Sequence, residues 1–148
     1  MRRVILILFT VFCFSCEKDS MLMDDLPVCQ SIIIEKDEYS ANVMFSDPFN
    51  ILAGDITDDC LRIHVSYGGG CEEHSFSLNY EDLPILSQYS GSLMLSHNAN
   101  GDLCEALITE YLYFDLTSVQ DTSMNVVRLM LQSNIADSDD YLLIDYYY

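Results

Sequence analysis

Basic residues are scarce in this chain, which has 24 Asp and Glu but only six Lys and Arg among 148 residues. Two of the six, Arg2 and Arg3, belong to an amino-terminal segment with the features of an export signal. Without that segment, four basic residues face 24 acidic ones, a formal charge of −20. A field of this sign repels phosphate backbones, so we expect no nucleic acid partner. It favours cationic ligands, divalent metals or basic proteins. The alternative is that the charge only keeps the protein soluble.

The sequence also lacks the common signatures of catalysis. It contains no Gly-x-Ser-x-Gly elbow, no P-loop and no Gly-x-Gly-x-x-Gly phosphate-binding motif. A thiol dyad of Cys71 with His74 or His97 would need cationic surroundings to lower the pKa of the thiol, and few cations are present. We therefore expect a protein that is not an enzyme and that uses no organic cofactor.

Long apolar runs are missing too, except at the amino terminus. Residues 4–14 are mostly apolar, follow the two arginines and lead into Ser15 and Cys16, which is an export-signal pattern too short to span a bilayer. This ending resembles the lipobox of bacterial lipoproteins, and with Glu-Lys-Asp at 17–19 it is most similar to the version used by the Bacteroidota. The resemblance implies cleavage before Cys16, lipidation of that residue, and anchoring at the outer membrane or the cell surface of a bacterial envelope.

These features predict three segments. Residues 1–15 would be a lipoprotein signal peptide, and residues 16–27 the lipidated cysteine with a tether, because this stretch is charged or flexible and has no sustained period. Residues 28–148 would form a single domain, which is long enough to bury a core.

Alternating apolar and polar residues predict that this domain is all-β. In the clearest stretch Leu61, Ile63, Val65 and Tyr67 alternate with polar residues that include His64, which we expect on the solvated face. Similar alternation recurs at 74–79, 92–97, 106–116, 127–132 and 141–148, with turn signals about every ten residues. We expect an antiparallel β-sandwich, immunoglobulin-like, with a small barrel as the alternative.

Three local expectations accompany this fold. The isoleucine run within 31–35 should form a strand buried on both faces, and the aromatic tail 141–148 should pair inside a sheet rather than form a free edge. Tyr111 and Tyr113 lie on the face opposite Leu112 and should form an exposed aromatic patch. Such a patch suits carbohydrate or protein contacts, although cross-strand tyrosine pairs also stabilise sheets without binding anything.

Several spaced motifs resemble a family of small, uncharacterised exported proteins of the Bacteroidota type. Residues 66–78 read SY-x-GGC-x-EH-x-F-x-L, and L-x-H at 95–97, D-x-C-x-A at 102–106 and FDL at 114–116 follow in order. The resemblance covers roughly residues 50–132. It implies a secreted or lipid-anchored domain without an established activity.

Four cysteines, Cys29, Cys60, Cys71 and Cys104, remain for the exported domain, and spacing alone allows three pairings. Exported thiols tend to oxidise, so we favour a disulfide between Cys71 and Cys104 that ties the glycine-rich bend 68–70 to the loop 98–102. Both nearby histidines would then be hydrogen-bonded at the edge of the core. A second bridge between Cys29 and Cys60 is favoured only slightly over two buried thiols.

The alternative is a metal site. Cys71, His74, His97 and Cys104 together offer two thiolates and two imidazoles, which is a tetrahedral ligand set for zinc or copper. The disulfide and this site exclude each other, although the histidines alone could hold a metal with Asp102 or Glu73.

Acid-rich loops are further candidates for cation binding. Residues 98–102 resemble half of a calcium loop but are better explained as a turn, and the carboxylates at 55–59 and 137–140 are best explained as solvated loops. We thus expect a lipid-anchored cell-envelope protein with a non-catalytic binding or accessory role. Its partners would be the membrane, through the lipid, and cationic or envelope proteins or carbohydrate. A metal-binding lipoprotein is the alternative.

Overall fold

A computed structural model describes residues 28–34, 46–83, 90–133 and 141–148 of the chain. The predicted signal peptide, the lipidation site Cys16 and the tether lie outside these residues, as does the acidic run 137–140. Within the described residues, no helix has the length and apolar character needed to cross a membrane.

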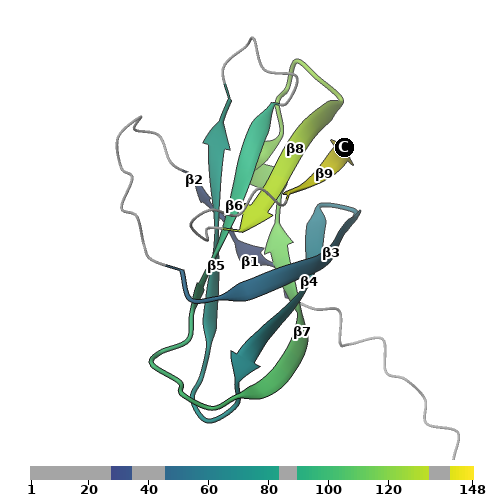
Figure 1. Cartoon of the computed structure of the whole chain (residues 1–148). Helices are drawn as coiled ribbons and strands as arrows, with labels where there is room; N and C mark the ends of the chain where they lie inside the picture. Colours follow the sequence, from purple (N-terminus) through teal and green to yellow (C-terminus); the bar gives the residue numbers. More distant parts are fainter. Residues whose placement is uncertain (1–27, 35–45, 84–89, 134–140) are drawn as a thin grey trace, which may run out of the picture.

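Two β-sheets pack face to face in the described part of the chain (Figure 1). The four-stranded sheet has the order β1-β7-β4-β3, with strands β1 (Gln30–Ser31), β7 (Ala106–Asp115), β4 (Cys60–Gly69) and β3 (Phe49–Thr57). The five-stranded sheet has the order β2-β5-β6-β8-β9, with strands β2 (Ile33–Ile34), β5 (Ser75–Asp82), β6 (Gly91–Asn98), β8 (Val126–Ser133) and β9 (Tyr141–Tyr147). A single 3₁₀ turn, η1 (Thr117–Val119), follows β7. The predicted all-β sandwich is confirmed, and the alternative of a small closed barrel is wrong, because no strand pairing among the described residues joins the two sheets.

The sheets are mixed rather than purely antiparallel. The pairs β3–β4, β4–β7, β5–β6 and β8–β9 are antiparallel, whereas β1–β7, β2–β5 and β6–β8 are parallel. The parallel pairing of β6 with β8 arises because β7, which lies between them in the chain, belongs to the opposite sheet. Alternation of side chains sets the face of each strand but not the direction of its neighbour.

The first strand changes sheets at Ile32. Gln30 pairs with Phe114 in the four-stranded sheet, and Ile33 pairs with Asn79 in the five-stranded sheet. The expectation that the isoleucine run is one strand buried on both faces is wrong, since Ile33 is 50% exposed. Because the run bridges two sheets at the margin of the sandwich, only alternate side chains reach the core.

The core lies between the inner faces of the two sheets. β4 contributes its odd-numbered residues, Leu61 to Tyr67, as its alternation predicts. They pack with buried leucines of β6 and β8: Leu93, Leu95, Leu129 and Leu131. In β3 the register shifts between Ile51 and Ala53, which leaves Leu52 exposed and turns Gly54 inward. A Cβ atom on Gly54 would lie 3.2 Å from Ile144 Cδ1, so β3 approaches β9 closely.

The carboxyl-terminal strand β9 is an edge strand. It pairs along one side with β8, and no strand of the described chain pairs with its other side. The expectation that the tail would pair inside a sheet is therefore wrong. Tyr146 nevertheless fixes the strand to the other sheet, because its side chain is buried and its hydroxyl donates to Asp59 Oδ1 while accepting a bond of 2.7 Å from Gln120 Nε2.

Candidate functional site

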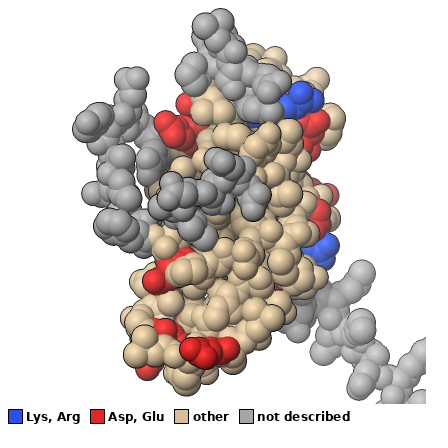
Figure 2. Space-filling model, viewed as in Figure 1, with Lys and Arg blue, Asp and Glu red and all other residues tan. Residues whose placement is uncertain are grey.

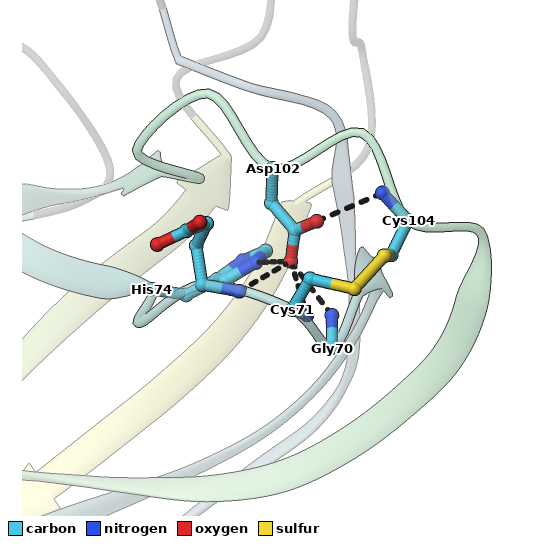
Figure 3. The surroundings of a disulfide bond; sticks show 6 residues. Gly70, Cys71, His74, Asp102 and Cys104 are labelled. Atoms are coloured by element: carbon cyan, nitrogen blue, oxygen red, sulfur yellow. Dashed lines mark hydrogen bonds and ion pairs between the residues drawn. A yellow bond between two sulfur atoms is a disulfide. The ribbon is translucent and has the colours of Figure 1, made fainter.

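The histidines and cysteines that the sequence singles out meet at one end of the four-stranded sheet, where β4 ends. Cys71 and His74 lie in the bend between β4 and β5, His97 lies near the end of β6, and Asp102 and Cys104 lie in the loop before β7. This loop turns tightly at Asn100 (φ 54°) and Gly101 (φ 75°), which confirms the turn at 98–102. The turn directs Asp102 toward the bend (Figure 3).

The carboxylate of Asp102 is enclosed by backbone N–H groups. Its Oδ2 accepts hydrogen bonds from the amides of Gly70 (2.7 Å), Cys71 (2.8 Å) and Glu72 (3.1 Å), and its Oδ1 accepts one from Cys104 (2.8 Å). Successive N–H groups that converge in this way form a nest for an anion, and here a side chain of the same protein fills it. The side chain is 0% exposed, and the amides of Cys104 and Cys71 are the main reason that the pKa of Asp102 is strongly lowered. Asp102 is therefore a buried carboxylate ion.

His74 links this carboxylate to His97. Its Nε2 lies 3.1 Å from Asp102 Oδ2, and its Nδ1 lies 2.8 Å from His97 Nε2. An ionised carboxylate only accepts hydrogen bonds, so His74 Nε2 must carry a proton. If His74 is neutral, its Nδ1 accepts the proton of His97 Nε2, and every bond in the row points toward Asp102.

His97 stands at the far end of this row, inside an aromatic cluster. It is 3% exposed, and its ring stacks on Phe76 with centroids 4.5 Å apart and on His74 with centroids 5.0 Å apart. Burial lowers the pKa of His97 below its ordinary value, so the neutral form is favoured. Its Nδ1 is buried and has no hydrogen-bond partner among the described residues. Tyr67 closes the cluster, and its hydroxyl donates to Glu110 Oε1 at 2.8 Å.

Two of the three glycines in the bend are required by this packing. A Cβ atom on Gly69 would lie 2.4 Å from His74 Nε2 and 3.0 Å from Asp102 Oδ2, so no larger residue fits there. Gly70 has φ +116°, a conformation that side chains disfavour, and it presents its amide to Asp102. Gly68 is exposed, and a Cβ atom there would meet nothing within 4 Å. The sequence indicates a broken strand at this point, and the structure adds the reason that it breaks.

Two disulfides are present, Cys29–Cys60 and Cys71–Cys104, the pairing that the sequence favours. The second joins the nest to the loop that supplies Asp102 (Figure 3). In this oxidised form Cys71 and Cys104 offer no thiolates, and His74 and His97 bond directly to each other. The four-ligand set for zinc or copper, which the disulfide excludes, is therefore not assembled in this oxidised form. A sulfur of each cysteine and an oxygen of Asp102 lie within 4.8 Å of one another.

The closed network can hold loops together, but it presents little to a substrate. The side chains of Asp102 and His74 are 0% and 3% exposed. Sequence reasoning named Asp102 as the start of the D-x-C-x-A motif, as part of a turn and as an optional metal ligand, but not as the centre of a network. Its central role could not be found from spacing, because its partners Gly70 to Glu72 lie about thirty residues earlier. The only signal is its position two residues before Cys104, whose amide it caps.

A second feature occupies the opposite end of β4, where Cys60 begins the strand. A pocket of about 590 Å³ lies there, bounded by the turn between β3 and β4, the end of β7 and the disulfide Cys29–Cys60. Arg62 and Tyr113 line it. Beside it on the outer face of the sheet Tyr111 is 51% exposed, as the sequence predicts, whereas Tyr113 is half-buried.

His64 is not simply a solvated residue on this outer face. It is half-buried, and its ring stacks on that of Tyr111 with centroids 4.5 Å apart. The guanidinium of Arg62 lies 5.2 Å from the centroid of the same tyrosine. These three residues form a flat aromatic and cationic surface next to the pocket.

No protein-family model and no curated protein matches the sequence. Solved structures do share its fold. A NigD-like immunity protein from Bacteroides caccae has a TM-score of 0.61 at 16% identity, over 81% of this chain and 64% of that one. A protein from Parabacteroides distasonis named for a relation to a toxin has a TM-score of 0.60 at 25% identity, over 80% and 61%. A protein of unknown function from Bacteroides vulgatus, DUF1344, has a TM-score of 0.56 at 17% identity, over 81% and 56%.

This chain spans less than two thirds of the length of each of these three proteins. The likeness shows a common sandwich fold. All three proteins come from Bacteroides or Parabacteroides.

Proposed function

We propose that this chain is a lipid-anchored protein of the bacterial cell envelope whose sandwich domain acts by binding a partner, without catalysis. The observation that carries the proposal is the closed state of the polar network. Asp102, His74 and His97 form the polar cluster that the sequence motifs single out, yet their side chains are buried and bonded to one another or to backbone amides. A catalytic group has to reach its substrate within hydrogen-bonding distance.

Two further observations support a binding role. The described residues expose a sheet face with Tyr111 and a neighbouring pocket. One protein with the same fold is named as an immunity protein and another for a relation to a toxin, and neither name refers to a reaction. The anchor rests on the lipobox at Cys16.

The experiment that tests the anchor is expression of the full chain in a Bacteroidota host, with Cys16→Ser as the matched control. We expect the wild-type chain in the membrane fraction, with an amino-terminal peptide that begins at an acylated Cys16 by mass spectrometry. The variant should lack this peptide and leave the membrane fraction. Wild-type protein without acyl groups would overturn the anchor.

The binding role is tested by chemical cross-linking on intact cells of the same strain. We expect one predominant adduct with an envelope or extracellular protein, and the adduct should weaken as salt is raised, because the domain is strongly acidic. Consumption of an envelope substrate by the purified chain, abolished by Asp102→Asn, would overturn the non-catalytic role.

A second candidate function, metal binding, rests on the cluster of Cys71, Asp102 and Cys104. It requires reduction of the disulfide, which would free two thiolates for zinc or copper together with the histidines. Metal analysis of the purified protein before and after reduction tests it. One equivalent of zinc that appears only after reduction would support it, and its absence in both states would exclude it.

A further inference from the structure

The pocket at the Cys60 end of β4 has an unbalanced charge. Three carboxylates line it, those of Asp58, Asp59 and Asp115, together with the single guanidinium of Arg62. That guanidinium is already paired, because Arg62 Nη2 and Nε each lie 3.0 Å from Oδ1 of Asp55, which lies outside the lining. The positive charge of Arg62 is therefore shared with a fourth carboxylate.

No other cation of the described residues is placed to neutralise this pocket. Their Lys and Arg residues are Arg62 and Arg128 alone, and Arg128 lies on β8 of the other sheet, 2.8 Å from its partner Asp145. Figure 2 shows the same imbalance on one face, where carboxylates lie around a largely uncharged centre and the basic side chains lie along one edge. A ligand for this pocket is thus expected to bring positive charge of its own.

Two of the three carboxylates are suited to receive it. Asp115 is held in place by the backbone N–H of Thr117 at 2.9 Å, and this bond lowers the pKa of Asp115, which therefore stays ionised. Asp58 is exposed at the tip of the turn, with φ 53°. Asp59, in contrast, accepts hydrogen bonds from Gln120 and Tyr146, and these bonds stabilise the fold.

The aromatic side of the pocket indicates what kind of cation fits. Tyr113 lines the pocket, and on the adjoining face Arg62 already stacks on Tyr111, 5.2 Å from the ring centroid. A guanidinium is planar, stacks on aromatic rings and donates paired hydrogen bonds to a carboxylate, whereas a lysine ammonium is a compact, strongly hydrated charge. The pocket has the size of small-ligand sites, so it can take a side chain together with adjoining backbone.

We propose that this pocket binds an arginine side chain presented by a basic partner protein. The inference rests on the binding role proposed above and names the chemistry of the partner. The guanidinium would lie against Tyr113 and bond to Asp115 and Asp58, while the exposed surface of Tyr111 and His64 would contact the neighbouring residues of the same partner segment. The charge complementarity predicts fast, salt-dependent association.

The test uses the full chain, purified in detergent, and a dye-labelled peptide, Gly-Arg-Arg-Gly, followed by fluorescence anisotropy. A peptide with citrulline in place of arginine has nearly the same shape without the charge, and a third peptide has lysine. We expect the citrulline peptide to bind at least tenfold more weakly, and the lysine peptide about threefold more weakly because it does not stack. Equal binding of the citrulline peptide would overturn the proposal, and equal binding of the lysine peptide would overturn its preference for arginine.

The pocket is tested by the double variant Asp58→Asn with Asp115→Asn. Asparagine tolerates the positive φ at residue 58, and at residue 115 it can still accept the N–H of Thr117, so the fold should be kept. The matched control is Glu81→Gln with Glu105→Gln, which removes the same charge from two exposed residues outside the pocket lining. We expect at least fivefold weaker binding for the pocket variant and less than twofold for the control.

Equal losses in the two variants would show only general attraction to an acidic protein and would overturn the proposed site. If the melting temperature of the pocket variant is lower than that of the wild type, the single variant Asp58→Asn is used instead. We expect it to bind the arginine peptide at least twofold more weakly. The result is separable from the anchor and cross-linking tests. An acylated chain that cross-links to a partner but ignores the arginine peptide would overturn the pocket alone, and a chain that binds the peptide without acylation would overturn only the anchor.

Discussion

The two ends of strand β4 both carry carboxylates, but those at one end are satisfied within the protein and those at the other end are open to a ligand. At the Gly69 end one carboxylate, Asp102, receives four backbone N–H groups and a histidine, and its side chain is fully buried. At the Cys60 end Asp58 and Asp115 line an open pocket whose one lining cation among the described residues, Arg62, is already paired with Asp55. Each end also has a disulfide. A carboxylate that makes all its hydrogen bonds within the protein stabilises the fold. A carboxylate that can still accept hydrogen bonds is available to a partner.

The largest expected effect comes from removing the disulfides. The two bridges close loops of 33 and 31 residues, so the entropy model gives them nearly the same contribution, about 3–4 kcal/mol. Cys71→Ser with Cys104→Ser should nevertheless cost more than Cys29→Ser with Cys60→Ser, because it also loosens the nest around Asp102. Urea unfolding of the two double variants measures the difference. Equal losses would mean that the nest holds together without its bridge.

Removal of the buried carboxylate should come next. Asp102→Ala leaves four amides and the buried His74 Nε2 without their acceptor, and polar groups are costly to leave unsatisfied. We expect the melting temperature to fall by roughly 10–15 °C. Asp102→Asn, which keeps one acceptor oxygen, should lose less. Acetate added to the alanine variant should restore part of the stability, and a normal melting temperature of that variant would refute the role of the nest.

Replacing either of two neighbouring glycines by alanine should have smaller effects on the free energy of unfolding, and the two effects should differ clearly. Gly69→Ala places a methyl group 2.4 Å from His74 Nε2, and overpacking of this kind costs about 1–3 kcal/mol. Gly68→Ala, one residue earlier, meets nothing within 4 Å and should change the free energy of unfolding by no more than about 0.5 kcal/mol. Thermal unfolding of the two variants compares them directly. Similar values would show that His74 can move away without loss.

The smallest expected effect is on pH dependence. The pKa of His97 is lower in the folded than in the unfolded protein, so its contribution to stability is complete above the unfolded pKa of about 6.5 and is lost as pH falls through the folded value. Asp102 contributes above about pH 4 and loses its effect only below that. From pH 7 to 5 we therefore expect the melting temperature to fall. His97→Phe should remove this dependence, and an unchanged profile would contradict it.

Much of the fold could be predicted from the sequence because its signals are local. The alternation from Leu61 to Tyr67 indicates both the strand and its buried face, and the turn at Asn100 and Gly101 is marked by its residue types. The parallel pairing of β6 with β8 has no local signal, because it depends on β7 joining the opposite sheet. The same holds for Ile32, where a change of sheet looks like a continuous buried strand.

The candidate site, like the fold, could be predicted from the sequence only in part. That Cys71, His74, His97 and Cys104 belong together follows from the motifs and from the faces of their strands. The geometry that decides their role does not follow, because the amides of Gly70 to Glu72 carry no side-chain signature of the carboxylate that they hold. The pocket at the other end was equally hidden, since its lining comes from three separate segments of the chain.

The position of the bridge Cys29–Cys60 would have a mechanical consequence under the proposed anchoring of the domain by its amino end. Force on the preceding segment would enter at residue 28 and would otherwise act on β1 and β2, which are two residues long each and could be peeled away. Cys29 instead passes the load to Cys60, the first residue of β4, a strand with neighbours on both sides. Rupture would then require shearing a central strand rather than unzipping a short one.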